Sequence, residues 1–177
     1  PIAEERFLGE PRALVLAPAR ELALQIAKDA ADLGKYAGLS VVTLVGGMDY
    51  EKQRKQLAAA PVDIIVATPG RLIDFANKQE LFLDQVELLV IDEADRMLDM
   101  GFIGEVDRIV AEARWRRQTM LFSATLEGTG LVKFANEVLK DPVELNAESP
   151  RSERRKIQQL MYLADSPEHK FALLCHL

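Results

Sequence analysis

The stretch Leu88-Leu89-Val90-Ile91-Asp92-Glu93-Ala94-Asp95 joins four consecutive apolar residues to a cluster of three carboxylates. A short, continuously apolar run is typical of a strand that is buried on both faces, as in a parallel sheet. In open parallel sheets, ligands bind outside the carboxyl ends of the strands. The sequence therefore predicts that Asp92, Glu93 and Asp95 lie where a ligand would bind.

Further short apolar runs occur along the chain, and segments with helical periodicity separate most of them. The runs cover residues 13–17, 41–45, 64–67, 120–122 and 143–145. The intervening segments carry apolar stripes at helical spacing. Strands that alternate with amphipathic helices are typical of βαβ units with right-handed crossovers. The predicted fold class is therefore α/β, with a parallel sheet and flanking helices.

Composition excludes several classes of protein. The 177 residues, a net charge of −6 and a hydrophobic fraction of 49% fit one soluble globular domain. No run approaches the roughly 20 apolar residues that cross a bilayer, and residues 1–20 do not have the pattern of a signal peptide, so we expect a cytoplasmic location and no membrane partner. Cys175 is the only cysteine, which excludes an internal disulfide and makes a Cys/His zinc site improbable.

Two basic clusters stand out against the acidic background. Arg114, Arg116 and Arg117 flank Trp115, and a second cluster comprises Arg151, Arg154, Arg155 and Lys156. Each cluster could be a solvated charged surface or could contribute to nucleic-acid binding. The Trp115 ring could stack on a base, although partial burial is the interpretation that we favour.

The acidic segment after residues 88–91 admits two interpretations. Asp92 could hold Mg²⁺ through the water shell of the ion while Glu93 orients an attacking water, which is the chemistry of nucleotide hydrolysis. Alternatively, Asp92 could cap the following helix while Glu93 and Asp95 interact favourably with its dipole.

Two other strand ends carry residues suited to phosphate. Residues 18–23, Pro-Ala-Arg-Glu-Leu-Ala, place Arg20 in the first turn of a helix, where it could meet a phosphate or pair with Glu21. Gly46 and Gly47 follow the next run and could allow a close backbone approach or form a plain turn.

The ends of two more runs have the same polar character. Thr68-Pro69-Gly70-Arg71 indicates a helix start that could cradle a phosphate or could simply leave an exposed arginine. The hydroxyls of Ser123 and Thr125 could bond to the Asp92 and Asp95 carboxylates or could cap the next helix. Acid, hydroxyl, glycine and arginine at five strand ends together favour a phosphate-handling enzyme.

In type and order, these motifs resemble those of the DEAD-box ATP-dependent RNA helicases. The resemblance covers nearly the whole chain, including residues 96–102, and residues 115–128 look most like the bacterial SrmB-like subgroup. It implies a RecA-like parallel sheet with flanking helices, of the P-loop NTPase type but incomplete. The subgroup would imply a role in assembly of the large ribosomal subunit.

The resemblance also implies a role for each motif residue. Asp92 would bind the Mg²⁺ of Mg-ATP through water, and Glu93 would act as the general base or orient the water. Asp95 with Ser123 and Thr125 would couple hydrolysis to closure of two domains. The residues implied to hold the sugar-phosphate backbone of RNA, without reading its sequence, are Pro18, Arg20, Glu21, Gly46, Gly47, Thr68, Pro69, Gly70 and Arg71.

The chain departs from the family pattern at two points. Ala19 stands where the family usually has threonine, and a lost hydroxyl contact would weaken RNA binding by about 1 kcal/mol. No G-x-x-x-x-G-K-[ST] loop occurs, so the backbone amides and the lysine that cradle the β and γ phosphates are absent from this sequence.

We therefore expect a fragment of a longer helicase that is inactive alone. Residues 1–147 would form the first RecA-like domain, truncated at its N-terminus, residues 148–156 a linker, and residues 157–177 the start of a second RecA-like domain. The parent would couple ATP hydrolysis to local unwinding of RNA, and the SrmB-like subgroup would imply ribosomal RNA. The alternative is an RNA- or protein-binding module on a RecA-like fold that does not hydrolyse ATP.

Overall fold

The computed structural model describes residues 7–125, 129–146 and 160–176. The chain divides into two compact units between Pro142 and Val143. The predicted linker at residues 148–156, with the basic cluster that begins at Arg151, lies outside the described residues. The domain boundaries stay predictions.

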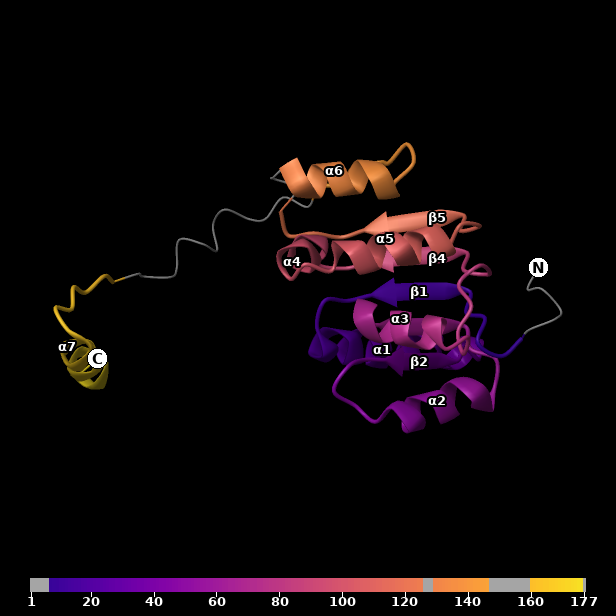
Figure 1. Ribbon diagram of the computed structural model, residues 1–177, viewed down its shortest axis with the longest axis horizontal. Helices are drawn as coiled ribbons and strands as arrows, with labels where there is room; N and C mark the ends of the chain where they lie inside the picture. Colours follow the sequence, from indigo (N-terminus) through magenta and orange to yellow (C-terminus); the bar gives the residue numbers. More distant parts are fainter. Residues whose placement is uncertain (1–6, 126–128, 147–159, 177) are drawn as a thin grey trace. The chain divides into compact units, whose positions relative to one another are not determined.

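The first unit contains one parallel sheet with the strand order β2-β3-β1-β4-β5 (Figure 1). The strands are β1 (Ala13–Leu16), β2 (Val41–Leu44), β3 (Ile64–Ala67), β4 (Leu88–Ile91) and β5 (Gln118–Leu121). Leu16 is in register with Ala67 on one side and with Ile91 on the other. The predicted α/β class with a parallel sheet is confirmed, and five of the predicted apolar runs supply its strands.

The sixth predicted strand, residues 143–145, is wrong. Val143 and Leu145 are 85% and 88% exposed and lie in no strand. An apolar run becomes a strand only where a neighbouring strand and a covering helix bury it. Neither is found beside these residues in the described part of the second unit.

Helices cover both faces of the sheet. They are α1 (Arg20–Gly34), the 3₁₀ turn η1 (Lys35–Ala37), α2 (Tyr50–Ala59), α3 (Pro69–Asn77), α4 (Ala94–Asp99), α5 (Ile103–Glu112) and α6 (Thr129–Val138). Helix α1 packs on one face through Ala23 and Ala27. The apolar sides of α2, α3, α4, α5 and α6 contribute to the larger core on the other face.

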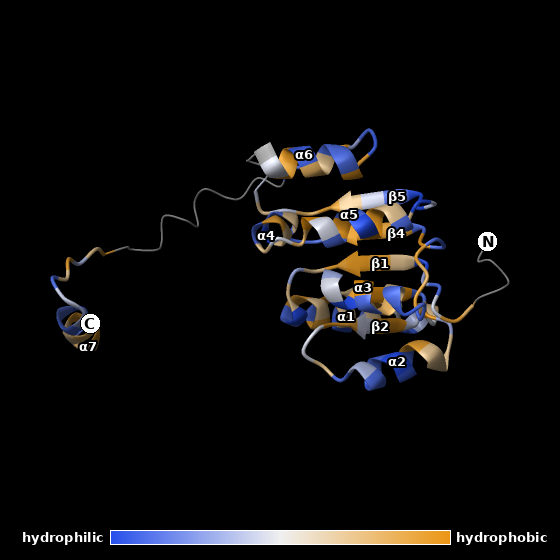
Figure 2. Ribbon diagram, in the orientation of Figure 1, coloured by the Kyte–Doolittle hydropathy of each residue, from blue (hydrophilic) through white to orange (hydrophobic). Residues whose placement is uncertain are grey.

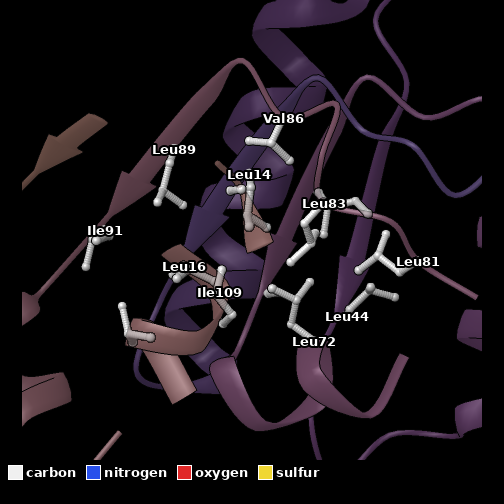
Figure 3. Packing of buried hydrophobic residues seen from close by; sticks show 14 of the residues in the cluster. Leu14, Leu16, Leu44, Leu72, Leu81, Leu83, Val86, Leu89, Ile91 and Ile109 are labelled. Carbon is white, nitrogen blue, oxygen red and sulfur yellow. The ribbon is translucent and has the colours of Figure 1, made fainter. Parts of the chain in front are cut away.

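The larger core joins strand and helix side chains in one cluster (Figure 3). Leu14, Leu16, Leu72 and Ile109 are fully buried there. Each such side chain stabilises the fold by about 1.5–3 kcal/mol relative to exposure. The colouring in Figure 2 follows this division, because the strands are largely hydrophobic while polar residues lie on the helices around them. The core thus fixes the strand ends that carry the predicted site.

The described part of the second unit contains α7 (Pro167–His176). The Ser166 hydroxyl accepts the N–H of His169 at 3.1 Å and so caps this helix. Phe171 and Leu174 are 68% and 70% exposed. No helix among the described residues has the length and hydropathy of a transmembrane span.

Candidate nucleotide and nucleic-acid site

The predicted motifs meet at the carboxyl edge of the sheet, because all five strands run in the same direction (Figure 1). Backbone hydrogen bonds continue past the strand ends. The N–H of Ala17 donates to the Ala67 carbonyl at 2.9 Å, and that of Asp92 donates to the Leu16 carbonyl at 3.0 Å. The motif residues therefore start from fixed backbone positions.

The glycine loop, residues 45–49, connects β2 to α2 and contacts two other predicted motifs. The N–H of Gly46 donates to Oγ1 of Thr68 at 3.4 Å. Gly47 has φ of +71°, and a Cβ at this position would lie 3.0 Å from Nη1 of Arg20. A side chain at position 47 would therefore strain the backbone and would make the Arg20 guanidinium shift. The structure brings Arg20, Gly46, Gly47 and Thr68 together.

The buried Gln53 side chain fixes the backbone of the glycine loop, and sequence reasoning did not identify this residue. Its side chain is 3% exposed and accepts the N–H of Val45 at 2.8 Å. The same amide donates to the carbonyls of Val45, Met48 and Asp49 at 3.2, 3.4 and 3.1 Å. A buried amide with these partners stabilises one loop conformation.

Arg71 also contacts the glycine loop. Its Nη1 donates to the Met48 carbonyl at 3.2 Å, and its guanidinium lies 5.5 Å from the centre of the Tyr50 ring. Only 14% of its side chain is exposed. The alternative of a simply exposed arginine at the start of α3 is therefore wrong, and the side chain joins α3 to the loop.

Tyr50 links the start of α2 to α3. Its ring stacks on Phe75 with centroids 4.4 Å apart, and Nζ of Lys78 lies 3.6 Å above it. The Tyr50 hydroxyl donates to Oε2 of Glu80 at 2.9 Å. Burial, the hydrogen bond and the charge of Glu80 raise the pKa of Tyr50 to about 12. The loop that precedes Tyr50 is thereby anchored at both of its ends.

Arg20 is an accessible cation at this edge. Its Nε and Nη2 donate to Oε1 of Glu21 at 3.1 and 2.9 Å, so the intrachain ion pair that the sequence suggested is present. The backbone N–H of Glu21 and the Arg20 side chain lower the pKa of Glu21. Because 46% of the Arg20 side chain is exposed, a phosphate can compete for it.

The two prolines differ from the other predicted RNA contacts in being buried. Pro18 precedes α1, and Pro69 occupies the first turn of α3. Gly70 is exposed, with open space where a Cβ would lie. The prolines therefore set where the helices begin, while Gly70 offers backbone close to solvent.

The acidic motif begins with an unusual backbone conformation. Glu93 has φ of 47° and ψ of 52°, in the left-handed region, and its N–H donates to Oδ1 of Asp92 at 2.9 Å. Such a conformation costs about 1–3 kcal/mol in a residue other than glycine. Because Asp92 accepts the N–H of the residue that precedes α4, it does not cap that helix, and the capping alternative is wrong for Asp92.

Glu93 carries an exchangeable ion pair. Its Oε2 lies 3.2 Å from Nη1 of Arg96, and the two side chains are 39% and 60% exposed. An ion pair exposed to this degree contributes at most about 1 kcal/mol. The carboxylate can therefore leave Arg96 at little cost.

Asp95 is hydrogen-bonded across to the end of β5. The Thr125 hydroxyl donates to Oδ2 of Asp95 at 3.2 Å, and the Ser123 hydroxyl donates to the Thr125 carbonyl at 2.7 Å. Burial acts to raise the pKa of Asp95, but hydrogen bonds from the Arg96 N–H and from Thr125 outweigh it and hold that pKa below its ordinary value. The expected contact between hydroxyls and the acidic motif is thus present for Asp95.

Asp92 fits a Mg²⁺ ion held mainly through water and phosphate oxygens. Its side chain is half-buried, and no hydrogen bond engages its Oδ2 among the described residues. In that part of the chain no group of three Asp, Glu, His or Cys side chains forms a metal cage. Mg²⁺ sites on nucleotides commonly use one or two carboxylates, so Asp92 provides a suitable protein ligand.

Trp115 lies away from this edge, three residues before β5 begins. Its side chain is 69% exposed, so the expected partial burial is wrong. The neighbouring Arg116 turns inward instead. Its guanidinium donates to Oγ1 of Thr119 at 2.8 Å and to the carbonyls of Val110, Ala113 and Val138.

Comparison with known proteins agrees with this geometry. SrmB, an ATP-dependent RNA helicase of Haemophilus influenzae, is 49% identical over 94% of this chain and 38% of its own length. RhlB, an ATP-dependent RNA helicase of Pseudomonas syringae pv. tomato, is 50% identical over the whole chain and 45% of its own length. The chain therefore spans less than half of the length of each relative. Its sequence identity to SrmB and to RhlB is nearly the same, so identity does not assign it to either of them.

A solved structure extends the similarity to the fold. The yeast DEAD-box splicing factor Prp28 superimposes with a TM-score of 0.72 and 36% identity over 94% of this chain and 39% of that protein. Its similarity confirms the RecA-like fold. The family model for the DEAD/DEAH box helicase matches residues 2–134. With its acidic motif, glycine loop and hydroxyl pair at one edge of this sheet, the chain belongs to the DEAD/DEAH box helicase family.

Proposed function

We propose that this chain is the main part of the first RecA-like domain of an ATP-dependent RNA helicase. One observation carries the proposal: the glycine loop, which the buried Gln53 side chain fixes, lies at the same edge of the sheet as two carboxylates. Of these, Glu93 is in an exposed ion pair and Asp95 is hydrogen-bonded to Thr125. The glycine loop suits binding of the RNA sugar-phosphate backbone, and the carboxylates suit ATP hydrolysis. The proposed helicase couples RNA binding to ATP hydrolysis.

The RNA half of the proposed site uses mainly fixed backbone. Gly46 and Gly47 present main chain without side chains, and Gly70 does the same in the first turn of α3. The N-terminus of a helix attracts phosphate because its first N–H groups have no partner within the helix. Arg20 adds a half-exposed charge. Such contacts hold phosphates and carry no sequence information, so the proposed binding is independent of sequence.

The catalytic half uses the three carboxylates in different ways. Asp92 would ligate Mg²⁺ of the bound nucleotide, and that ion would supply charge stabilisation to the phosphates. Glu93 would leave Arg96 and orient the attacking water. Asp95 is the positioning group, since its hydrogen bond to Thr125 ties the start of α4 to the end of β5.

Other features of the proposal concern the whole protein. The missing phosphate loop would come from chain that lies outside this sequence, so the 177 residues alone should not turn over ATP. Because residues 115–128 follow the SrmB-like pattern, we propose ribosomal RNA as the substrate, assembly of the large ribosomal subunit as the process, and a cytoplasmic location.

The experiment compares RNA-stimulated ATP hydrolysis by this chain and by a protein that extends it to the full length of its relatives. We expect hydrolysis only in the longer protein. Glu93→Gln in that protein should lower turnover by at least about 100-fold, the usual contribution of a positioned general base. Glu105→Gln, on α5, is the matched control and should leave turnover unchanged.

A longer protein that binds RNA and ATP but never hydrolyses ATP would overturn the enzymatic proposal. In that case the fold would serve as an RNA-binding scaffold. Full activity of Glu93→Gln would instead show that the role assigned to Glu93 is wrong.

A further inference from the structure

We propose that Arg114, Trp115 and Arg117 form a second RNA-binding surface, at the edge of the sheet opposite the nucleotide site. We call these three residues the Trp115 platform. The proposal goes beyond the function above, because the platform precedes β5 while the motifs of the proposed helicase follow the strands.

The Trp115 platform is held rigidly by its neighbours. Arg116, within the same segment, hydrogen-bonds to the carbonyls of Val110 in α5, of Ala113 just after α5, and of Val138 in α6, at 2.8, 3.0 and 3.3 Å. The N–H of Arg117 donates to the Glu87 carbonyl at 2.8 Å. Binding to a segment that is already ordered loses little conformational entropy.

The Trp115 ring is available for stacking. It is 69% exposed, and the Arg114 guanidinium lies 5.7 Å from its centre. Tryptophan side chains are well buried on average, so a large exposed ring on an ordered turn indicates a binding surface. A flat ring beside a cation provides a surface on which a nucleic-acid base can stack.

Positive charge is concentrated around the ring. Arg117 is 82% exposed, and no ion pair or hydrogen bond engages the Arg114 guanidinium among the described residues. Glu87 is the acidic side chain that faces the platform, and Arg12 holds it at 2.9 Å while Arg117 lies 3.6 Å away. Glu112, at the end of α5, is paired with Arg108 at 3.0 Å. Both nearby carboxylates are therefore already neutralised, although the whole chain has a net charge of −6.

The combination favours RNA over an acidic peptide. An acidic peptide would use the arginines but has no planar group for the Trp115 ring. Single-stranded RNA offers a base for the ring and flanking phosphates for both arginines. The Trp115 platform would anchor one part of a folded RNA while the carboxyl edge of the sheet acts on another strand of the same RNA.

The test uses the fluorescence of Trp115, which is the only tryptophan in the 177 residues. The chain is titrated with a short oligouridylate, and free N-acetyltryptophanamide corrects for absorption by the RNA. We expect saturable quenching. The logarithm of the binding constant should fall with the logarithm of salt concentration with a slope of about −1.4, the value for two phosphate contacts on a single strand.

Variants separate the platform from the carboxyl edge. Arg114→Gln and Arg117→Gln should each reduce the salt slope by about 0.7. Trp115→Leu, followed by the anisotropy of labelled RNA at a concentration where the platform dominates binding, should weaken affinity by about tenfold or more. Arg54→Gln, at an exposed arginine on α2 that is paired with Glu51, is the matched control. Arg20→Gln should leave the midpoint of Trp115 quenching unchanged, which makes this test independent of the proposed helicase site.

Three results would overturn the proposal. They are the absence of quenching by oligouridylate, quenching that is lost in Arg20→Gln but retained in Arg114→Gln and Arg117→Gln, and quenching by polyglutamate but not by RNA. The last result would identify the platform as a surface for an acidic protein partner.

Discussion

The two halves of the carboxyl edge are built in opposite ways. In the half formed by β1, β2 and β3, the glycine loop is fixed by Gln53 and Arg71, whose side chains are largely buried. In the half formed by β4 and β5, Glu93 has a strained backbone, and its carboxylate is engaged by a surface ion pair with Arg96. A surface that must bind a repeating backbone benefits from rigidity, whereas groups that act on a nucleotide need to exchange partners.

The largest effect is expected from removing the support of the glycine loop. Gln53→Met keeps the shape of the side chain but leaves the buried N–H of Val45 without its partner. We expect a loss of about 2–4 kcal/mol in the free energy of unfolding, measured by urea denaturation. Gln56→Met, exposed on the same helix, should change it by less than about 0.5 kcal/mol. Equal effects of the two substitutions would show that the loop does not depend on Gln53.

A second prediction concerns Tyr50 and alkaline pH. The pKa of Tyr50 is raised from 10.0 to about 12, so the folded protein keeps this proton where the unfolded chain has lost it. The stabilisation is fully present below pH 10 and is lost as the pH rises toward about 12. Tyr50→Phe should therefore flatten the decline of unfolding free energy over this interval, by about 1–2 kcal/mol. Tyr36→Phe, at a tyrosine that is 94% exposed, should retain the decline.

A smaller and opposite effect is expected in the acidic half. Glu93→Gly removes the cost of the left-handed backbone and should raise the free energy of unfolding by about 1 kcal/mol. Glu93→Ala keeps the strained conformation and should give no such gain. If the glycine variant is no more stable than the alanine variant, the backbone at position 93 is not strained.

The smallest effect is expected at the link between Asp95 and Thr125. Thr125→Val removes one exposed hydrogen bond and should lower stability at neutral pH by about 0.5 kcal/mol. The lowered pKa of Asp95 stabilises the fold above its ordinary value of 3.8, and this contribution is lost as the pH falls below that value. The difference between Thr125→Val and the parent should therefore shrink in acid. A difference that does not change with pH would exclude ionised Asp95 as the acceptor.

The sequence predicts those site residues whose placement depends only on residue type and strand order. Parallel strands bring their carboxyl ends to one edge whatever the side chains are, so Asp92, Glu93, Gly46 and Thr68 could be placed from apolar runs alone. The left-handed φ of Glu93 had no local signal, because glutamate rarely adopts it.

The supporting residues could not be predicted because their burial depends on tertiary contacts. Gln53 occurs in a helix of mostly polar residues, and only the fold of the loop over α2 encloses it. At residues 114–117, local pattern does not decide which side chain turns inward. The carbonyls at the ends of α5 and α6 select Arg116, and Trp115 is left in solvent.

The most direct test of the division between the halves is the affinity of the longer protein for labelled single-stranded RNA, measured in Gly47→Ala and Glu93→Gln. A Cβ at position 47 would require a strained backbone and would lie 3.0 Å from Arg20. We predict that Gly47→Ala weakens binding by about tenfold, or 1.4 kcal/mol, while Glu93→Gln changes it by less than about twofold. Equal losses in both variants, or a loss confined to Glu93→Gln, would contradict the account.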